Sequence, residues 1–319
     1  VDTAQKSNEL SPKEMPVFWK ELAGGTVGGV IGLAVVYPLD TVKSRLQTSG
    51  RARYTGTVHV LTSMARKEGV LSLYRGLLSP IAGAGLTFSL SFSSYGLACR
   101  SLLRRRGAED FDRDRLTLSE MTLAGTFAGL VNSPLKQVIE RVKNVMQVRL
   151  GREHKAPYSW SGACAADLVR REGVVRGLFF GMGTTTLREG VQCSIYYPTY
   201  TLTKAYLISG NQASRGKVPD AVIHMLAGGL AGCVTWLPPV YSLDVVKTRV
   251  QTALPGTYRG PWDCAIKMWR AEGAQPFVRG VGPALARAFP HHALVFLGYE
   301  TTLLLLSGPP LSATRQGHH

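Results

Sequence analysis

The sequence contains five cysteines, and no two of them form a Cys-x-x-Cys pair. This spacing argues against a disulfide framework and against a zinc site. A compact basic motif with interleaved aromatic residues is also missing, so we expect no nucleic-acid partner despite the net charge of +16. The chain shows no nucleophile with a paired base, no metal-ligand cluster and no phosphate-binding glycine loop. We therefore expect neither an enzyme nor a metal or cofactor site.

Charge is missing from three long stretches of the chain. Residues 22–39 and 76–99 carry no charged side chain. Residues 221–243 also contain no aspartate, glutamate, lysine or arginine, and His224 is their one histidine. Each stretch is long enough for a bilayer span, which needs about 17–25 predominantly apolar residues. The basic residues gather at the ends of such stretches, where they would face anionic lipid headgroups. The pattern predicts a membrane protein.

One motif occurs three times along the chain. The segment Tyr37–Gln47 recurs as Tyr241–Gln251, and a third copy spans Val138–Gln147. The acidic residue of the motif returns at intervals of 100 and 104 residues. A period of this length is too long for a solenoid and is typical of an internally duplicated transporter.

The features around each motif also recur in the same order. A Gly-x-x-x-Gly pair, which allows helix backbones to approach closely in lipid, precedes each copy. These pairs are Gly25 and Gly29, Gly125 and Gly129, and Gly228 and Gly232. A polar linker, an amphipathic segment ending in Glu-Gly and a second apolar span follow. We therefore predict an all-α membrane protein of three repeats, residues 17–106, 117–208 and 219–306, with two transmembrane helices and one short amphipathic helix in each.

Over Val17–Leu306 these residues resemble the mitochondrial carrier family, whose signature is Pro-x-acid-x-x-base followed by a glutamine. The chain has Pro38, Val138 and Ser242 in the proline position. The resemblance implies six tilted helices with pseudo-threefold symmetry around a central cavity, with the short helices on the matrix side. It also implies a multi-pass protein of the mitochondrial inner membrane with both termini toward the intermembrane space. Because one chain carries all three repeats, we expect it to form the pathway alone, as a monomer.

Two departures from the signature affect the helices. Pro134 lies one turn before the usual proline position of the second repeat, which predicts an early kink. A register starting at Pro134 would put Lys136 and Ile139 in the charged positions, and we reject it because it loses the acid–base pair and Gln147.

The third repeat has one additional residue between its Gly-x-x-x-Gly pair and its acid. We expect Pro238 and Pro239 to absorb this residue as a local distortion.

The acid and the base of each motif are three residues apart and share one helical face. The resemblance implies that each acid meets the base of the next repeat and closes the matrix end of the cavity. The expected pairs are Asp40 with Lys143, Glu140 with Lys247, and Asp244 with Lys43. One turn further on, Gln47, Gln147 and Gln251 are expected to brace this ring by hydrogen bonds. Static helix-end salt bridges are the alternative interpretation.

The opposite gate of the family follows an aromatic-acid-x-x-base pattern. Lys204 and Glu300 are the charged residues that match it, so we expect one ion pair there and a weak cytoplasmic gate.

Substrate contacts in this family fall one to two turns after the glycine that begins each even-numbered helix. Counting from these glycines gives Gly83, Arg188 and Arg287, with Glu189 adjacent and Trp236 as a further candidate. Arginine binds carboxylates bidentately, and a glutamate meets an amine or quaternary ammonium. The set fits a small zwitterion or carboxylate. Pairing of Arg188 with Glu189, snorkelling of Arg287 and plain packing of Trp236 are the alternatives.

The chain looks most like the carnitine/acylcarnitine and basic amino acid subgroup, but it has Tyr37 where the carnitine pattern has histidine. A nucleotide, cofactor or proton/anion carrier is a second hypothesis, and a degenerate carrier acting as a scaffold or receptor is a third. The resemblance also implies cardiolipin binding at backbone amides near helix N-termini. The matching residues are Gly56, Arg75, Gly76, Gly181, Gly260 and Gly280.

Overall fold

The computed structural model describes residues 17–48, 54–106, 116–148, 158–213, 218–238, 240–253 and 256–307. In this part of the chain every regular element is helical. The long helices are α1 (Val17–Thr48), α3 (Leu78–Arg105), α4 (Leu118–Val148), α6 (Met182–Ala213), the pair α7 (Asp220–Thr235) and α8 (Val240–Thr252), and α10 (Val281–Ser307). The shorter helices are α2 (Thr57–Glu68), α5 (Ser161–Phe179) and α9 (Pro261–Glu272), with 3-10 turns at Val70–Tyr74 and Gln275–Phe277.

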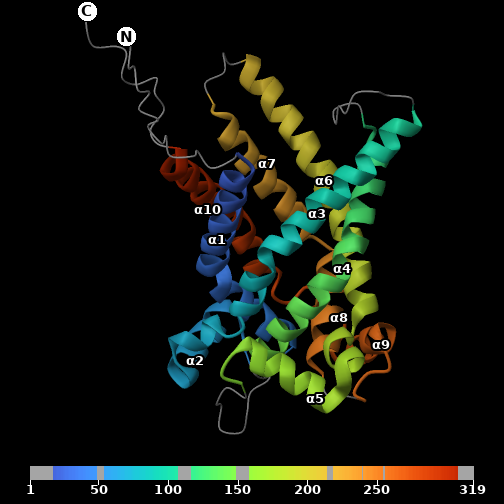
Figure 1. Cartoon of the computed structure of the whole chain (residues 1–319). Helices are drawn as coiled ribbons and strands as arrows, with labels where there is room; N and C mark the ends of the chain where they lie inside the picture. The colour runs from blue at the N-terminus through green and yellow to red at the C-terminus, as the bar shows by residue number, and fades with distance from the viewer. Residues whose placement is uncertain are drawn as a thin grey trace, which may run out of the picture.

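The long helices form a closed bundle. Packing runs from α1 to α3, α3 to α4, α4 to α6, α6 to α7, and α7 to α10, and α10 packs back on α1. Figure 1 shows α2, α5 and α9 together at one end, whereas α1 begins and α10 ends at the other. Each repeat contributes two long helices and one short helix to this arrangement. The predicted three-repeat helical fold is confirmed.

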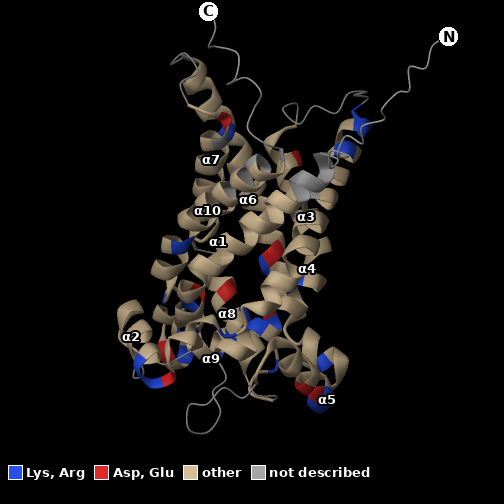
Figure 2. Cartoon of the chain, turned by 60° about the vertical axis from the view of Figure 1, so that its left-hand side comes forward, with Lys and Arg blue, Asp and Glu red and all other residues tan. Residues whose placement is uncertain are grey.

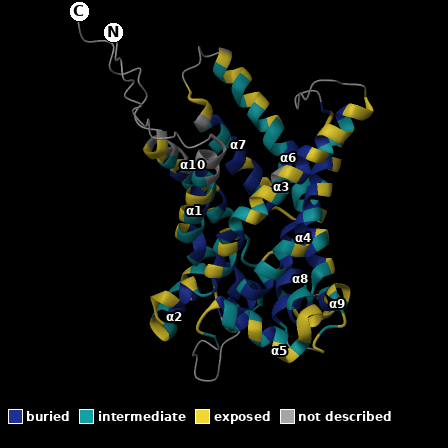
Figure 3. Ribbon diagram, in the orientation of Figure 1, coloured by how far each residue is buried: buried dark blue, intermediate teal, exposed yellow. Residues whose placement is uncertain are grey.

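Two described segments are long and apolar enough to cross a membrane, residues 23–48 and 70–105, and the bent pair 222–235 and 240–252 would make a third. The helices α4 and α6 have the length of a span, but charges such as Lys136, Glu140 and Arg188 interrupt them. Figure 3 shows the exposed residues along the outward faces of the bundle and the buried ones between helices. Because the buried residues include the charged side chains of Asp40, Arg188 and Lys247 while many large apolar side chains are exposed, polarity is concentrated inside the bundle.

The additional residue of the third repeat lies at a break in the helix. α7 ends at Thr235, α8 begins at Val240, and the two meet at an angle of 67°. Pro238 lies in this break, as the sequence predicts, while Pro239 lies outside the described residues. In the second repeat, by contrast, α4 continues through Pro134 as one helix.

The turn into each even-numbered helix depends on a glycine in the left-handed region. Gly76, Gly181 and Gly280 have φ values of +84°, +88° and +90°. In each repeat, the residue that directly precedes this glycine accepts a hydrogen bond at its backbone carbonyl. The donor is a side chain of the motif helix, three residues before the acid of the motif. The donors and acceptors are Tyr37 and Arg75 (3.0 Å), Gln137 and Phe180 (2.9 Å), and Tyr241 and Arg279 (2.7 Å). The three repeats therefore fix this turn in the same way.

The glycine pair of the second repeat brings α4 against α6. A Cβ atom added at Gly129 would lie 2.4 Å from the carbonyl oxygen of Glu189, and one at Gly125 would lie 2.5 Å from that of Cys193. Both obstacles are backbone atoms, which cannot rotate away.

We expect Gly129→Ala to lower stability by about 1–3 kcal/mol, because the methyl group forces α4 away from α6. Gly25→Ala is the matched control, since nothing lies within 4 Å of its added Cβ. Thermal unfolding of the purified protein in detergent measures both, and equal midpoints for the two variants would contradict the close-packing argument.

Candidate functional site

A ring of ion pairs crosses the bundle where the motif helices α1, α4 and α8 converge. The carboxylate of Asp40 lies 2.6 Å from the ammonium of Lys143, and that of Asp244 lies 2.7 Å from Lys43. Glu140 contacts Lys247 in the same way. The structure thus brings together all three predicted pairs, and each pair joins two repeats. We call these six residues the matrix ring, after the side of the membrane on which the family resemblance places them.

Two arginines from the even-numbered helices also bind the matrix ring. Arg287 on α10 lies 2.9 Å from Asp40, and Arg188 on α6 lies 2.7 Å from Glu140. Arg188 is also 3.7 Å from Asp244. The candidate substrate arginines and the ring acids therefore form one connected network, which the sequence did not indicate.

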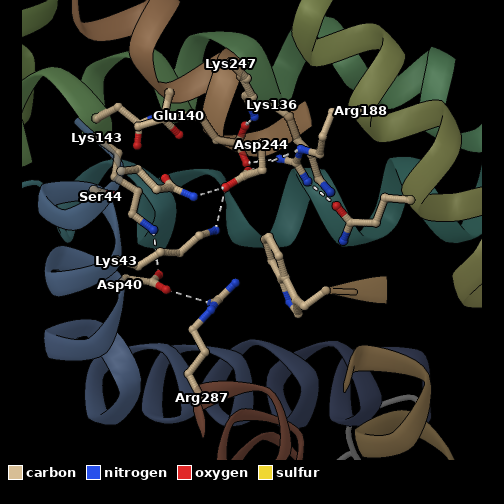
Figure 4. Close-up of a pocket in the computed structure, with 15 residues that line it drawn as sticks. Asp40, Lys43, Ser44, Lys136, Glu140, Lys143, Arg188, Asp244, Lys247 and Arg287 are labelled. Carbon is tan, nitrogen blue, oxygen red and sulfur yellow. Dashed lines mark hydrogen bonds and ion pairs between the residues drawn. The ribbon is translucent and has the colours of Figure 1, made fainter. Parts of the chain in front are cut away.

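The network lines a cavity of about 180 Å³ (Figure 4). Its walls come from α1, α4, α6, α8 and α10 and from the break between α7 and α8. Besides the matrix ring, the lining includes Lys136, Arg188, Gln192, Trp236 and Arg287. Figure 2 shows that charged residues lie mainly in the half of the bundle nearer α2, α5 and α9. Such charges are expensive at membrane depth unless they are paired.

Trp236 lies at the break after α7 and faces cations of the protein itself. The ammonium of Lys43 lies 3.7 Å from the centre of an indole ring, and the guanidinium carbon of Arg287 lies 5.1 Å from it. The side chain is also largely buried, at 8 % exposure. Trp236 therefore holds two cations of the network against the electron-rich face of its ring.

Glu189 lies beneath the cavity wall and is fully buried. Its carboxylate is 2.7 Å from the ammonium of Lys136 and 2.8 Å from Arg188. The alternative pairing of Arg188 with Glu189 is therefore present in the structure. Gly83 is buried against the Ile139 side chain, so the expected smooth glycine wall packs on α4 in this conformation.

The three motif glutamines are buried, but they make different contacts. Gln47 donates to Asp244 at 2.9 Å and so braces the matrix ring directly. Gln147 accepts from Ser44 at 2.8 Å, and Gln251 accepts from Asn144 at 2.6 Å. Ser44 and Asn144 each lie four residues after their acid. A polar residue occurs at this position in all three copies, which is the signal that sequence reasoning missed.

The short helices are attached to the motif helices by arginine–glutamate pairs. Arg45 binds Glu68 at the end of α2 with two hydrogen bonds of 2.7 and 2.9 Å. Arg249 binds Glu272 at the end of α9, which lowers the pKa of that carboxyl group. In the second repeat Val145 replaces this arginine, and Arg141 binds Glu172 at 3.3 Å instead.

The predicted cytoplasmic pair is only partly described. Lys204 lies on α6, whereas the side chain of Glu300 on α10 lies outside the described residues. Nearby, the rings of Tyr95 and Tyr197 stack at 3.8 Å, and Tyr200 bonds Nδ1 of His224 at 2.6 Å.

The glycines expected to bind cardiolipin lie next to helix N-termini. Gly56 and Gly260 directly precede α2 and α9, and Gly76, Gly181 and Gly280 precede α3, α6 and α10. The guanidinium of Arg75 pairs with Glu68 at 2.8 Å. Lipid binding at these positions stays a prediction.

A family model described as "Mitochondrial carrier protein" matches residues 14–106, 114–211 and 217–309. The chain belongs to the mitochondrial carrier family. This carrier is 36 % identical over 294 residues to the mitochondrial basic amino acids transporter of Rattus norvegicus, covering 90 % of each chain. It is 33 % identical over 307 residues to the mitochondrial carnitine/acylcarnitine carrier protein of the same species, covering 93 % of this chain and 97 % of that one. The human basic amino acids transporter is 35 % identical over 294 residues, which cover 90 % of this chain and 91 % of that one.

These matches confirm the resemblance and the transport function. The carrier moves small-molecule metabolites, as the family's members do. From the sequence alone, Lys136 enters only in the alternative register starting at Pro134, which we reject. The structure shows that Lys136 nevertheless lines the cavity and pairs with Glu189.

We expect Asp40→Asn to lower the stability of the carrier by about 3–5 kcal/mol, because it removes the buried carboxylate that two partly buried cations, Lys143 and Arg287, share. Arg106→Gln removes a partly exposed pair with Glu120 and should cost less than about 1 kcal/mol. Thermal unfolding in detergent measures both changes. A midpoint for Asp40→Asn as high as that of Arg106→Gln would show that the matrix ring does not stabilise this conformation.

Proposed function

We propose that this carrier moves a small carboxylate or zwitterionic metabolite across the mitochondrial inner membrane by alternating access. The observation that carries the proposal is the bonding of Arg188 and Arg287 to acids of the matrix ring inside a central cavity. The planar guanidinium group of an arginine matches the geometry of a carboxylate and can bind it with two parallel hydrogen bonds.

The mechanism follows from a competition for these arginines. With the matrix ring formed, the cavity is closed on the side of α2, α5 and α9, which we take to be the matrix side. A substrate carboxylate that binds Arg287 or Arg188 competes with Asp40 or Glu140 for the same guanidinium groups. Buried ion pairs have a small net free energy because desolvation offsets their attraction. Substrate binding can therefore shift the equilibrium between the closed and the open ring, which is biased by only a few kcal/mol. Each 1.4 kcal/mol of difference in binding free energy changes the equilibrium constant about tenfold.

The relatives narrow the chemistry of the substrate. Their names state transport of basic amino acids and of carnitine or acylcarnitine, and all of these carry a carboxylate. We therefore favour an amino acid or carnitine-like compound over a nucleotide, and a transporter over an enzyme or a degenerate scaffold.

We further propose that the protein acts as a monomer with cardiolipin at its helix N-termini. One chain supplies the closed bundle, which supports a pathway through a single protomer. The ends of α1 and α10 opposite the short helices would then place both termini toward the intermembrane space.

Uptake into cardiolipin-containing proteoliposomes tests the function. With a labelled panel of amino acids, carnitine esters, carboxylates and nucleotides, we expect saturable uptake of a carboxylate-bearing compound. Arg287→Ala should lower that uptake about tenfold or more, the loss of one charge-assisted hydrogen bond. Arg106→Gln is the control, because its partner Glu120 lies at the start of α4 and outside the cavity. Uptake of nucleotides alone would reject the substrate class, and no uptake by the folded protein would favour the scaffold.

The orientation has its own test. A C-terminal epitope tag should be degraded by added protease once the outer membrane is ruptured, with the inner membrane still intact. A tag that is lost only after detergent treatment would place the C-terminus in the matrix.

A further inference from the structure

Lys136 breaks the threefold pattern of the cavity. It lies on α4, four residues before the ring acid Glu140. The same position holds Val36 in the first repeat and Val240 in the third. The second repeat therefore adds to the cavity wall a cation that the symmetry of the other repeats does not supply.

The partner of Lys136 is also peculiar to the second repeat. Glu189 lies eight residues after Gly181, and the matching positions after Gly76 and Gly280 hold Ala84 and Ala288. The Lys136 ammonium lies 2.7 Å from one Glu189 oxygen, while Arg188 lies 2.8 Å from the other. Each oxygen of Glu189 therefore lies within ion-pair distance of a cation of the protein, although Oε1 accepts no hydrogen bond from the described residues.

The charges around the cavity do not cancel. The three acids and the three lysines of the matrix ring balance one another. Outside the ring remain Arg188, Arg287 and Lys136 against the single carboxylate of Glu189. The balance is two positive charges. Moreover, Nε of Arg287 has no hydrogen-bond partner among the described residues, although it is buried.

We propose that Lys136 is the residue that sets the charge class of the substrate, and that the carrier binds a small dicarboxylate in preference to an amino acid or a betaine. This inference rests on the proposed function and narrows its carboxylate class to dicarboxylates, in place of the amino acid or carnitine-like compound that the names of the relatives favour. A dicarboxylate offers one carboxylate to each arginine and cancels the two excess charges. An amine or quaternary ammonium would have to displace Lys136 from Glu189, against repulsion from the ammonium that it displaces.

The experiment compares uptake of labelled succinate with uptake of labelled carnitine and arginine by the full chain in cardiolipin-containing proteoliposomes. Malonate and glutarate serve as competitors that vary the spacing of the two carboxylates. The measured quantity is the ratio of kcat/KM for succinate to that for carnitine. We expect the wild-type carrier to favour succinate and to be inhibited by the other dicarboxylates.

Four variants isolate the charge of Lys136. Lys136→Gln frees Glu189 to meet a substrate cation, so the ratio should fall about tenfold or more, the effect of one charge-assisted hydrogen bond. Lys136→Arg keeps the charge and should keep most of the selectivity. Glu189→Gln should raise the ratio. The double variant Lys136→Gln/Glu189→Gln restores the excess of two positive charges and should return the ratio toward the wild-type value, which a merely structural role of Lys136 would not do.

The outcomes separate this inference from the proposed function. Wild-type uptake of carnitine or arginine in preference to every dicarboxylate would overturn the inference and leave the carrier function intact. An unchanged ratio in a folded Lys136→Gln variant would overturn it as well. No uptake of any of these compounds or of the wider panel by the folded wild-type protein would overturn both.

Discussion

The constraint on which this structure depends is that charge placed at membrane depth must be paired inside the protein. The bundle carries charged side chains in the middle of helices that otherwise face lipid, and the cost of leaving one of them unpaired exceeds most packing energies. Each ring acid therefore takes a lysine from the next repeat. The same ion pairs that neutralise the charges also hold α1, α4 and α8 together. Charge neutralisation and helix packing therefore depend on the same six residues.

Because the ring joins three repeats through reversible contacts, its geometry also suits a transporter. Arg188 and Arg287 contact the ring acids directly, and a ligand carboxylate is chemically equivalent to those acids. In the proposed mechanism, the substrate site and the ion pairs that close the pathway therefore share their cations. A protein that only needed a stable bundle would have no reason to expose such cations to a cavity.

Most of the framework was readable from the sequence, because it depends on spacing within one motif. The recurrence of Asp40, Glu140 and Asp244 fixed the repeats, and the three-residue step to each lysine gave the pairs once the helices were arranged around an axis. What spacing could not give are contacts between different helices at different heights. The attachment of Arg188 to Glu140 and the pairing of Lys136 with Glu189 depend on how far α4 and α6 slide past each other. The packing of Gly83 against Ile139 depends on the height of α3 relative to α4. The extra residue near Pro238 was visible, but its effect on Trp236 was not.

The break between α7 and α8 makes the third repeat mechanically unlike the other two. In the first and second repeats one unbroken helix, α1 or α4, runs from the end of the bundle opposite the short helices to the ring, so a continuous helical backbone connects the two. In the third repeat α7 and α8 meet at an angle of 67°, and Trp236 lies at this bend. The indole of Trp236 contacts Lys43 and Arg287, so side-chain contacts as well as the backbone connect this bend to the ring. The ion-pair ring is thus threefold, whereas among the described motif helices the break lies in the third repeat alone.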